Sequence, residues 1–291
     1  MALANGTADS APRQGGFDVM FQFRSAAVLA AILFAPAAQA GALPACAGAV
    51  EAAGVQVVRV EKNGALILDD GRAVHVESLL LPAGAKDKAP DFLAGQALNE
   101  LSQLTHDHGV TLTSAIPKED RYGRVRAQVF LPDNTDDPWL QVALLRRGLA
   151  RVSLAPDRHE CASELYAAEA AARAAKNGLW AFPAYVMRTP DTLGRDTGTF
   201  QVVEGKVLKA TVKDGRAYLD FGPDWHTDFT VVVSPDDMKN FVAAGIDPRG
   251  YEGKRVRVRG FVQELDGPEI EVAMPEGIEV LPDVPLKPAM Q

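Results

Sequence analysis

The chain has 291 residues, of which 47% are hydrophobic and 23% charged, and its formal net charge at pH 7 is -8. This length and apolar content suffice for one or two domains with cores of their own. Because nucleic-acid binding depends on neutralising phosphates, the acidic balance argues against a dedicated nucleic-acid-binding protein. A local basic patch is still compatible with this acidic balance.

The first 40 residues are expected to form an N-terminal extension followed by a secretory signal peptide. Arg24 precedes an apolar run over 26–34, and Ala38-Gln39-Ala40 has the small-x-small pattern of a cleavage site. The run is shorter than the ~20 residues that span a bilayer, so a retained anchor is the less favoured alternative. Translation begins at Met1 or at Met20. We expect cleavage after Ala40, a mature chain without a transmembrane segment, and a periplasmic or secreted location.

The mature chain contains two cysteines, Cys46 and Cys161. In an oxidising compartment two such cysteines can form a disulfide that closes a long loop. The alternative is a pair of free thiols. A catalytic Cys–His pair is disfavoured, because nothing around Cys161 marks it as a nucleophile.

Residues 41–185 are expected to form a first domain of short strands and amphipathic helices. Alternating apolar runs predict strands, and the Asp69-Asp70-Gly71 sequence between two of them predicts a hairpin turn. Apolar residues at helical spacing predict a helix that begins at Asp91 as the N-cap. In chain order we expect strands over 54–60 and 64–81, a helix over 91–106, strands over 109–115 and 124–131, and helices over 138–148 and 160–178.

Residues 186–198 are rich in Pro, Gly and Asp and are predicted to be a linker. Beyond them, residues 199–285 show almost only strands and Asp-Gly turns, with one short helical segment over 236–245. Five or so strands with a helix between the third and the fourth suit a second small OB-like β-barrel.

The order of these elements, together with three motifs, resembles the thermonuclease (staphylococcal nuclease-like) family. The motifs are Asp120-Arg121-Tyr122-Gly123-Arg124, the segment Arg147–Val152, and a stretch from Glu169 to Gly178-Leu179-Trp180. The resemblance covers roughly residues 55–182. It implies an OB-fold five-stranded barrel plus helices, so the fold class is mainly β with helices (α+β). Residues 199–285 resemble, more loosely, the C-terminal OB-like extension of some bacterial members.

The resemblance also implies a chemistry. Active members cleave phosphodiester bonds with a calcium ion held by two aspartates, with two arginines on the phosphate and a glutamate near the attacking water. Calcium requires several oxygen ligands, which carboxylates supply. Arginine suits the growing charge of the phosphate in the transition state.

This chain departs from that pattern at most of the implied positions. The two calcium-ligand positions fall on Gly64 and Leu80, and the position of the glutamate falls on Ala83. His75 stands where the hairpin arginine is implied. Arg124 matches the other arginine, with Tyr122 beside it. Asp69, Asp70, Asp87 and Asp91 are near in sequence and are possible substitute ligands, although turn and cap roles are favoured for them.

We therefore assign no catalytic residue and no metal ligand. Candidate binding residues are Arg121, Arg124, and Arg255, Arg257 and Arg259, which share one face of a predicted strand. The leading hypothesis is a secreted, non-catalytic binding or interaction module of the cell envelope, without a cofactor and with nucleic acid or an envelope protein as partner. The alternative is an active phosphodiesterase that uses calcium and other ligands near Arg124. A third hypothesis is a structural envelope protein that docks a protein partner.

Overall fold

The computed structural model describes residues 43–282 apart from 115, 135 and 225. The predicted signal peptide, both possible starts and the cleavage after Ala40 lie outside the described residues. The described residues belong to one compact unit, which runs from Ala40 to Gln291. Over this described part of the chain, no helix has the length and apolar character needed to cross a bilayer.

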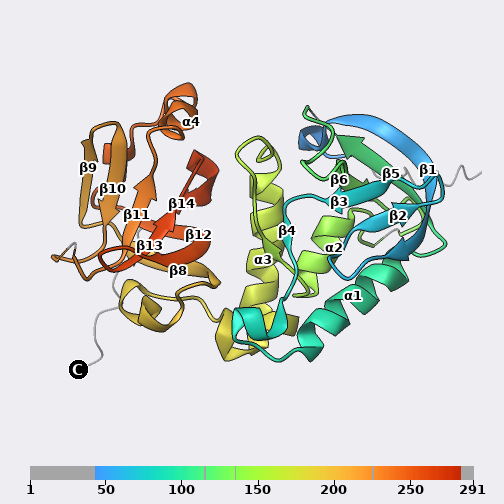
Figure 1. The fold of residues 1–291 in the computed structure, drawn as a ribbon, viewed down its shortest axis with the longest axis horizontal. Coiled ribbons are helices and arrows are strands. Elements are labelled where there is room, and N and C mark those ends of the chain that lie inside the picture. Colours follow the sequence, from blue (N-terminus) through green and yellow to red (C-terminus); the bar gives the residue numbers. More distant parts are fainter. Residues whose placement is uncertain (1–42, 115, 135, 225, 283–291) are drawn as a thin grey trace, which may run out of the picture. The chain divides into compact units, whose positions relative to one another are not determined.

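A closed five-stranded barrel forms the first half of this unit (Figure 1). Around the barrel the strand order is β1-β2-β3-β6-β5, in which β3 and β6 are parallel and the other pairs are antiparallel. The strands are β1 (Ala49–Val60), β2 (Leu66–Leu68), β3 (Ala73–Val76), β5 (Gly109–Ser114) and β6 (Val125–Phe130). The predicted α+β class with an OB-type barrel is confirmed.

Alternation of apolar and polar residues places the barrel core. Val74 and Val76 of β3, with Val125, Ala127 and Val129 of β6, are buried inside. The residues between them therefore face away from the barrel axis, because successive side chains of a strand point to opposite sides. The Asp-Asp-Gly sequence at 69–71 connects β2 to β3 as predicted.

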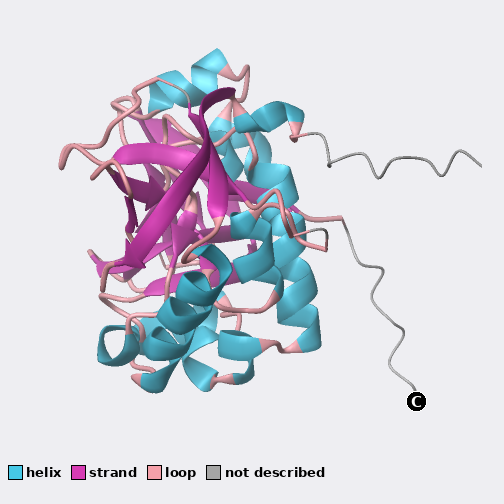
Figure 2. Cartoon of the chain, turned by 90° about the vertical axis from the view of Figure 1, so that its right-hand side faces the viewer, coloured by secondary structure: helices cyan, strands magenta, loops and turns pink. Residues whose placement is uncertain are grey.

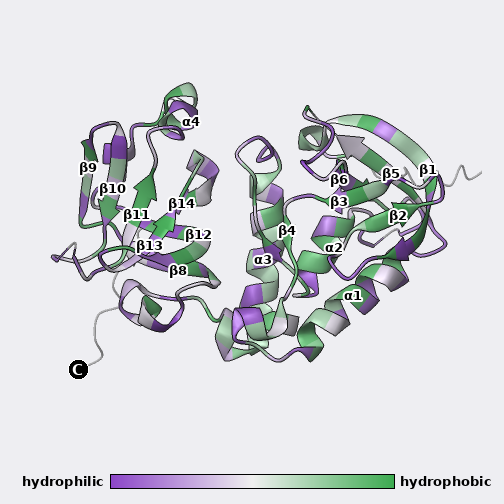
Figure 3. Cartoon of the chain, in the orientation of Figure 1, coloured by the Kyte–Doolittle hydropathy of each residue, from purple (hydrophilic) through white to green (hydrophobic). Residues whose placement is uncertain are grey.

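Helices pack beside the strands of this barrel (Figure 2). They are α1 (Phe92–Thr105), α2 (Leu140–Arg146) and α3 (Ala162–Ala175); a two-stranded sheet pairs β4 (Leu79–Leu80) with β7 (Arg151–Val152). Hydrophobic and hydrophilic residues are interspersed along α3 (Figure 3). Asp91 stands at the N-cap position of α1 as predicted, but its side chain caps no helical N–H. Its Oδ1 instead accepts a hydrogen bond from the N–H of Ala85 at 2.9 Å.

The second half of the unit repeats the connectivity of the first. The strand order is β9-β10-β11-β13-β12-β8, in which β11 and β13 are parallel. In addition, β14 pairs with β12 on the edge opposite β8. Only residues 207 and 208 separate β8 from β9. The two strands at the ends of this order are therefore consecutive in the chain. The elements are β8 (Phe200–Lys206), β9 (Lys209–Lys213), β10 (Arg216–Asp220), β11 (Thr230–Val233), α4 (Met238–Ala243), β12 (Arg255–Glu264), β13 (Pro268–Glu271) and β14 (Ile278–Val280).

The segment predicted as a linker packs against the strands β8 to β14, the second strand set. It contains a 3-10 helix, η5 (Pro190–Arg195), and Leu193 of this helix is fully buried in the core of that set. Arg188 pairs with Val203 in a bridge and its Nε lies 2.8 Å from Oδ2 of Asp196. The residue limits of the predicted domains stay a prediction.

Buried polar contacts connect α3 to the second strand set. Arg259 of β12 reaches Glu169 of α3 with an Nη1–Oε2 distance of 2.6 Å, and both side chains are nearly inaccessible to solvent. The hydroxyl of Tyr166 donates a hydrogen bond to the carbonyl of Glu276 at 2.8 Å. β7 contacts the second strand set as well, because Nη1 of its Arg151 donates a hydrogen bond to the carbonyl of Phe200 at 2.7 Å.

Candidate functional site

The outer face of β3 and β6 carries the residues that the sequence singled out in the first barrel. In the parallel register His75 lies opposite Arg126, and Val74 lies opposite Val125. Arg124 precedes β6 by one residue and so lies on the same side as Arg126. The face therefore combines the position of the implied hairpin arginine with the Tyr-Gly-Arg turn.

Asp120 holds the Tyr-Gly-Arg turn. Its Oδ1 accepts hydrogen bonds from the N–H groups of Tyr122 (2.8 Å) and Arg124 (3.0 Å). Its Oδ2 lies 2.6 Å from Nη2 of Arg124. Burial alone would raise the pKa of Asp120, but these bonds from Arg124 and Tyr122 hold it below its usual value. Gly123, at φ +73°, supplies the left-handed conformation of the turn.

Tyr122 lies between the two arginines of the turn. The guanidinium carbon of Arg121 is 4.8 Å from the ring centroid, and that of Arg124 is 5.3 Å away. The side chain of Arg124 is 21% exposed and is paired with Asp120, whereas Arg121 has no carboxylate partner among the described residues. Tyr122 is 67% exposed. The turn thus presents one unpaired cation and one aromatic ring to solvent.

His75 contributes no positive charge to this face near neutral pH. Burial lowers the pKa of His75 below its ordinary value of 6.5, and the nearby guanidiniums of Arg124 and Arg126 lower it further, against a smaller opposing effect of Asp120. A neutral imidazole can donate or accept one hydrogen bond at each ring nitrogen but gives no bidentate contact to a phosphate.

Next to His75 lies a buried ionic network that sequence reasoning missed. Nε of Arg126 is 2.6 Å from Oε1 of Glu77, and Oε2 of Glu77 is 3.0 Å from Nε of Arg158. Arg126 also forms a bidentate pair with Asp157, at 2.6 and 2.8 Å. Glu77, Arg126 and Arg158 are all buried. The alternation of Glu77 and Arg126 with apolar residues was a signal that these two side chains share a face. It did not show that the loop with Arg158 would cover them.

A cavity of about 280 Å³ lies beside this network. Glu77, Arg158, Gln128 and Thr113 line it together with Cys46. Thr113 donates a hydrogen bond to the carbonyl of Ala47 at 2.5 Å, and Oε1 of Gln128 accepts one from the indole of Trp139 at 3.0 Å. Most of the polar side chains that line this cavity therefore already have partners within the protein.

The positions where the resemblance implies calcium ligands are apolar and packed. A side chain at Gly64 would start 2.6 Å from Cδ1 of Leu81, and the φ of Gly64 is +81°. Leu80 belongs to the short strand β4 and pairs with Arg151 of β7. No oxygen ligand is available from either side chain.

Three of the four possible substitute carboxylates, those of Asp70, Asp87 and Asp91, accept hydrogen bonds elsewhere. Asp87 is buried, and its Oδ2 accepts hydrogen bonds from Arg151, from the hydroxyl of Tyr185 (both 2.9 Å) and from the N–H of Ala83 (2.8 Å). Asp70 binds the N–H and Nε of Arg72 in the exposed hairpin turn. Over residues 43–282, with the three gaps noted above, no three acidic, His or Cys side chains gather as a potential metal site.

The arginine stripe of the second strand set is held by glutamates. Val256 and Val258 are fully buried, so the arginines between them share the other face as predicted. Arg255 is bound to Glu204; Nη2 of Arg257 lies 3.1 Å from Oε2 of Glu204; and Nη2 of Arg259 lies 2.5 Å from Oε1 of Glu279. Their role as phosphate contacts stays a prediction.

The two cysteines form the predicted disulfide. Cys46 lies in the 3-10 helix η1 (Ala45–Ala47), before β1, and Cys161 directly precedes α3. The bond therefore attaches the start of the described chain to the loop that carries Asp157 and Arg158.

Comparison with known proteins gives a family match over part of the chain. A family model described as staphylococcal nuclease homologue matches residues 85–182. The matched segment contains the Tyr-Gly-Arg turn and helices α1, α2 and α3, and it begins after Gly64, His75 and Leu80. None of the curated proteins searched matched the chain.

Proposed function

We propose, from the premise that residues 85–182 form a staphylococcal nuclease-like domain, that this protein is a non-catalytic derivative of such a nuclease. It acts as a binding or interaction module of the cell envelope. The observation that carries the proposal is the absence of side-chain oxygens at the two implied calcium positions, Gly64 and Leu80. Without carboxylates, nothing at these positions offsets the dehydration of the ion.

The charges around Arg124 support the same proposal. In an active phosphodiesterase, cations must be available to the phosphate as its charge grows. Here Asp120 already occupies the guanidinium of Arg124, and His75 is neutral near pH 7 because burial and the neighbouring arginines lower its pKa. A phosphate would have to displace Asp120 and would find no second cation at His75.

The carboxylates of this face are also committed. Asp120 binds Arg124, and Glu77 binds both Arg126 and Arg158. A calcium ion recruited to either carboxylate would have to replace an arginine and leave that cation without its partner. For the buried Arg126 this is costly, because an unpaired buried charge is strongly unfavourable.

A binding role has specific residues available to it. Arg121 and Tyr122 combine a cation that has no carboxylate partner among the described residues with an exposed ring. Such a pair can contact a phosphate and stack on a base, or bind an acidic side chain of an envelope protein. The Cys46–Cys161 disulfide supports a location in an oxidising compartment outside the cytoplasm.

The experiment that tests the proposal is a combined cleavage and binding assay on the mature chain. The protein is incubated with single-stranded DNA and RNA, with and without millimolar Ca²⁺. We expect no cleavage of either polymer. Calcium-dependent cleavage that is lost in Arg124→Ala would overturn the proposal in favour of the active phosphodiesterase.

The same assay separates the two classes of partner. Binding that weakens steeply with salt, and that is reduced in Arg121→Ala but not in Arg59→Ala, identifies nucleic acid as the ligand. Arg59 is the control because it is an exposed arginine of β1 outside the turn. Absence of both cleavage and binding assigns the module to a protein partner.

A further inference from the structure

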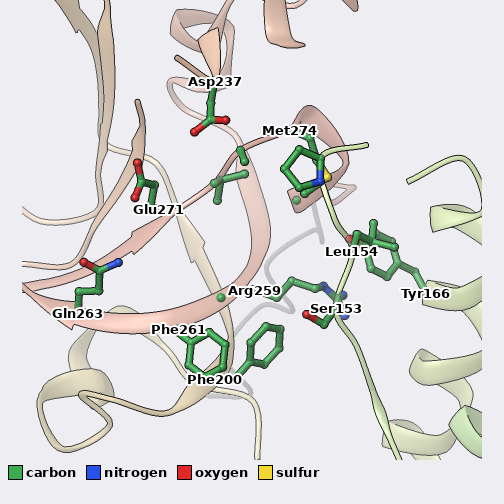
Figure 4. A pocket seen from close by; sticks show the side chains of 15 residues that line it. Ser153, Leu154, Tyr166, Phe200, Asp237, Arg259, Phe261, Gln263, Glu271 and Met274 are labelled. Atoms are coloured by element: carbon green, nitrogen blue, oxygen red, sulfur yellow. The ribbon is translucent and has the colours of Figure 1, made fainter. Parts of the chain in front are cut away.

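A second cavity, of about 390 Å³, lies away from the Tyr-Gly-Arg turn (Figure 4). On one side it is bounded by Ser153, Leu154 and Tyr166. On the other side it is bounded by β12, β13 and the segment that follows them, including Met274. This volume falls in the range of small-molecule sites, which are concave, mostly apolar and equipped with a few polar groups.

The floor of the cavity is aromatic. Phe200 and Phe261 meet edge to face, with ring centroids 5.4 Å apart. Phe200 is buried and Arg151 lies over its ring, but Phe261 is 54% exposed. A large aromatic side chain that is left half-uncovered inside a cavity offers a stacking surface to an apolar or aromatic ligand.

The cation in the lining of the cavity, Arg259, already has carboxylate partners within the protein. Arg259 is paired with Glu169 at 2.6 Å and with Glu279 at 2.5 Å, and its guanidinium lies 3.9 Å from the centroid of Tyr166. Each Nη atom thus has a carboxylate partner, although Glu169 also binds Arg173 and Glu279 also binds Arg257. An anionic ligand would have to compete with these carboxylates for Arg259.

Two carboxylates at the wall are not neutralised. Figure 4 shows Asp237 and Glu271 on the side of the cavity opposite Leu154 and Tyr166. Neither takes part in an ion pair with any of the described residues, and Oδ2 of Asp237 only accepts a hydrogen bond from Ser234 at 2.6 Å. Because Arg259 already has carboxylate partners, Asp237 and Glu271 are the charged lining residues that stay available to a ligand.

We propose that this cavity binds a small organic cation, with its aromatic or aliphatic body against Phe261 and its ammonium group toward Asp237 and Glu271. The apolar floor determines the body of the ligand, and the unpaired carboxylates determine its charge. Because the lining comes both from the second strand set and from α3 with the loop after β7, the bound cation also contacts Leu154 and so bridges these two parts. This site is independent of the Arg124 face and of the proposed function.

Three probes of one shape but different charge test the proposal on the mature wild-type protein. They are phenethylammonium, the neutral 2-phenylethanol and the anion phenylacetate, each titrated by ligand-observed NMR. We expect phenethylammonium to bind with a dissociation constant of about 1 mM or below. The neutral probe should bind roughly tenfold more weakly and the anion more weakly still. Equal affinities for the three probes, or no binding of phenethylammonium up to about 10 mM, would overturn the proposal.

Variants place the binding in this cavity. The double variant Asp237→Asn, Glu271→Gln should weaken phenethylammonium roughly tenfold and remove its advantage over the alcohol. Phe261→Ala should weaken both the amine and the alcohol by about fivefold. Asp214→Asn, which removes a charge from the exposed β9–β10 turn, is the control and should change nothing. Unchanged affinity in the double variant contradicts the assignment.

Discussion

At the scale of single residues, the face around Arg124 combines the Tyr-Gly-Arg turn with arginines that already have carboxylate partners. Asp120 and Gly123 still build the turn that presents Arg124, since the hydrogen bonds of Asp120 and the positive φ of Gly123 are local features. The chemistry that the resemblance implies depends on further positions, which fall on Gly64, His75 and Leu80. Under the proposed function, an arginine in the expected place marks the fold rather than activity.

His75 should make the stability of the protein depend on pH. Because burial and Arg124 lower its pKa in the folded state, the unfolded chain takes up the proton first as pH falls through about 6.5. The free energy of unfolding should therefore decrease below that pH. Urea unfolding across this range should show a smaller decrease for His75→Gln than for the wild type. Parallel pH profiles of the two proteins would contradict the assignment.

Asp120 should stabilise the fold more than its counterpart in another turn. Asp120→Ala removes two backbone hydrogen bonds and an ion pair of which the carboxylate is only 15% exposed. We expect a loss of about 1–2 kcal/mol in the free energy of unfolding. Asp70 binds the N–H and Nε of Arg72 in the same way, but its carboxylate is 43% exposed. Asp70→Ala is thus the matched control, with a loss below about 1 kcal/mol. Equal losses would refute the role of burial.

At the scale of elements, β12 shows how far a strand pattern can be interpreted. Alternation of Arg and Val predicts correctly that Val256 and Val258 face the core and that the arginines share the other face. It does not reveal what covers that face. The partners of Arg259 come from α3 and β14, at sequence separations of 90 and 20 residues, so only the tertiary structure shows the stripe to be paired.

Along β12 the cost of removing an arginine should depend on burial. Arg259→Ala leaves the fully buried Glu169 without one of its cations, and we expect a loss of about 3–5 kcal/mol in the free energy of unfolding. Arg255 is on the same face but is 32% exposed, so Arg255→Ala should cost less than about 1 kcal/mol. Urea denaturation of both variants measures the difference. Similar costs would show that the Arg259–Glu169 pair does not stabilise the fold.

At the scale of the whole molecule, local patterns predicted the elements and long-range contacts determined the site. The barrel, the hairpin turn and the helices follow from periodicity and turn residues. The Glu77–Arg126–Arg158 network was not predictable, because Glu77 directly follows β3, Arg126 belongs to β6 and Arg158 lies in a loop that folds back over them. The 186–198 segment was expected to be a linker from its Pro and Gly content, yet Leu193 is buried in a core.

The disulfide should stabilise the molecule through the long loop that it closes. Cys46 and Cys161 are 115 residues apart, so the bond restricts a large part of the unfolded chain. We expect the double variant Cys46→Ser, Cys161→Ser to lose about 2–5 kcal/mol of unfolding free energy. Wild-type protein treated with a reductant should unfold at the temperature of that variant, as measured by circular dichroism. No change on reduction would contradict this role.

Calcium calorimetry on the mature protein tests most directly whether the catalytic centre of the nuclease-like domain has been lost. Gly64 and Leu80 offer no oxygen ligands, and Asp120 and Glu77 are already bound to arginines. The titration should therefore show no saturable heat up to about 10 mM Ca²⁺, the weak limit of protein calcium sites being about 1 mM. A saturable one-to-one isotherm that disappears in Asp120→Asn or Glu77→Gln would contradict the account and restore an active site beside Arg124.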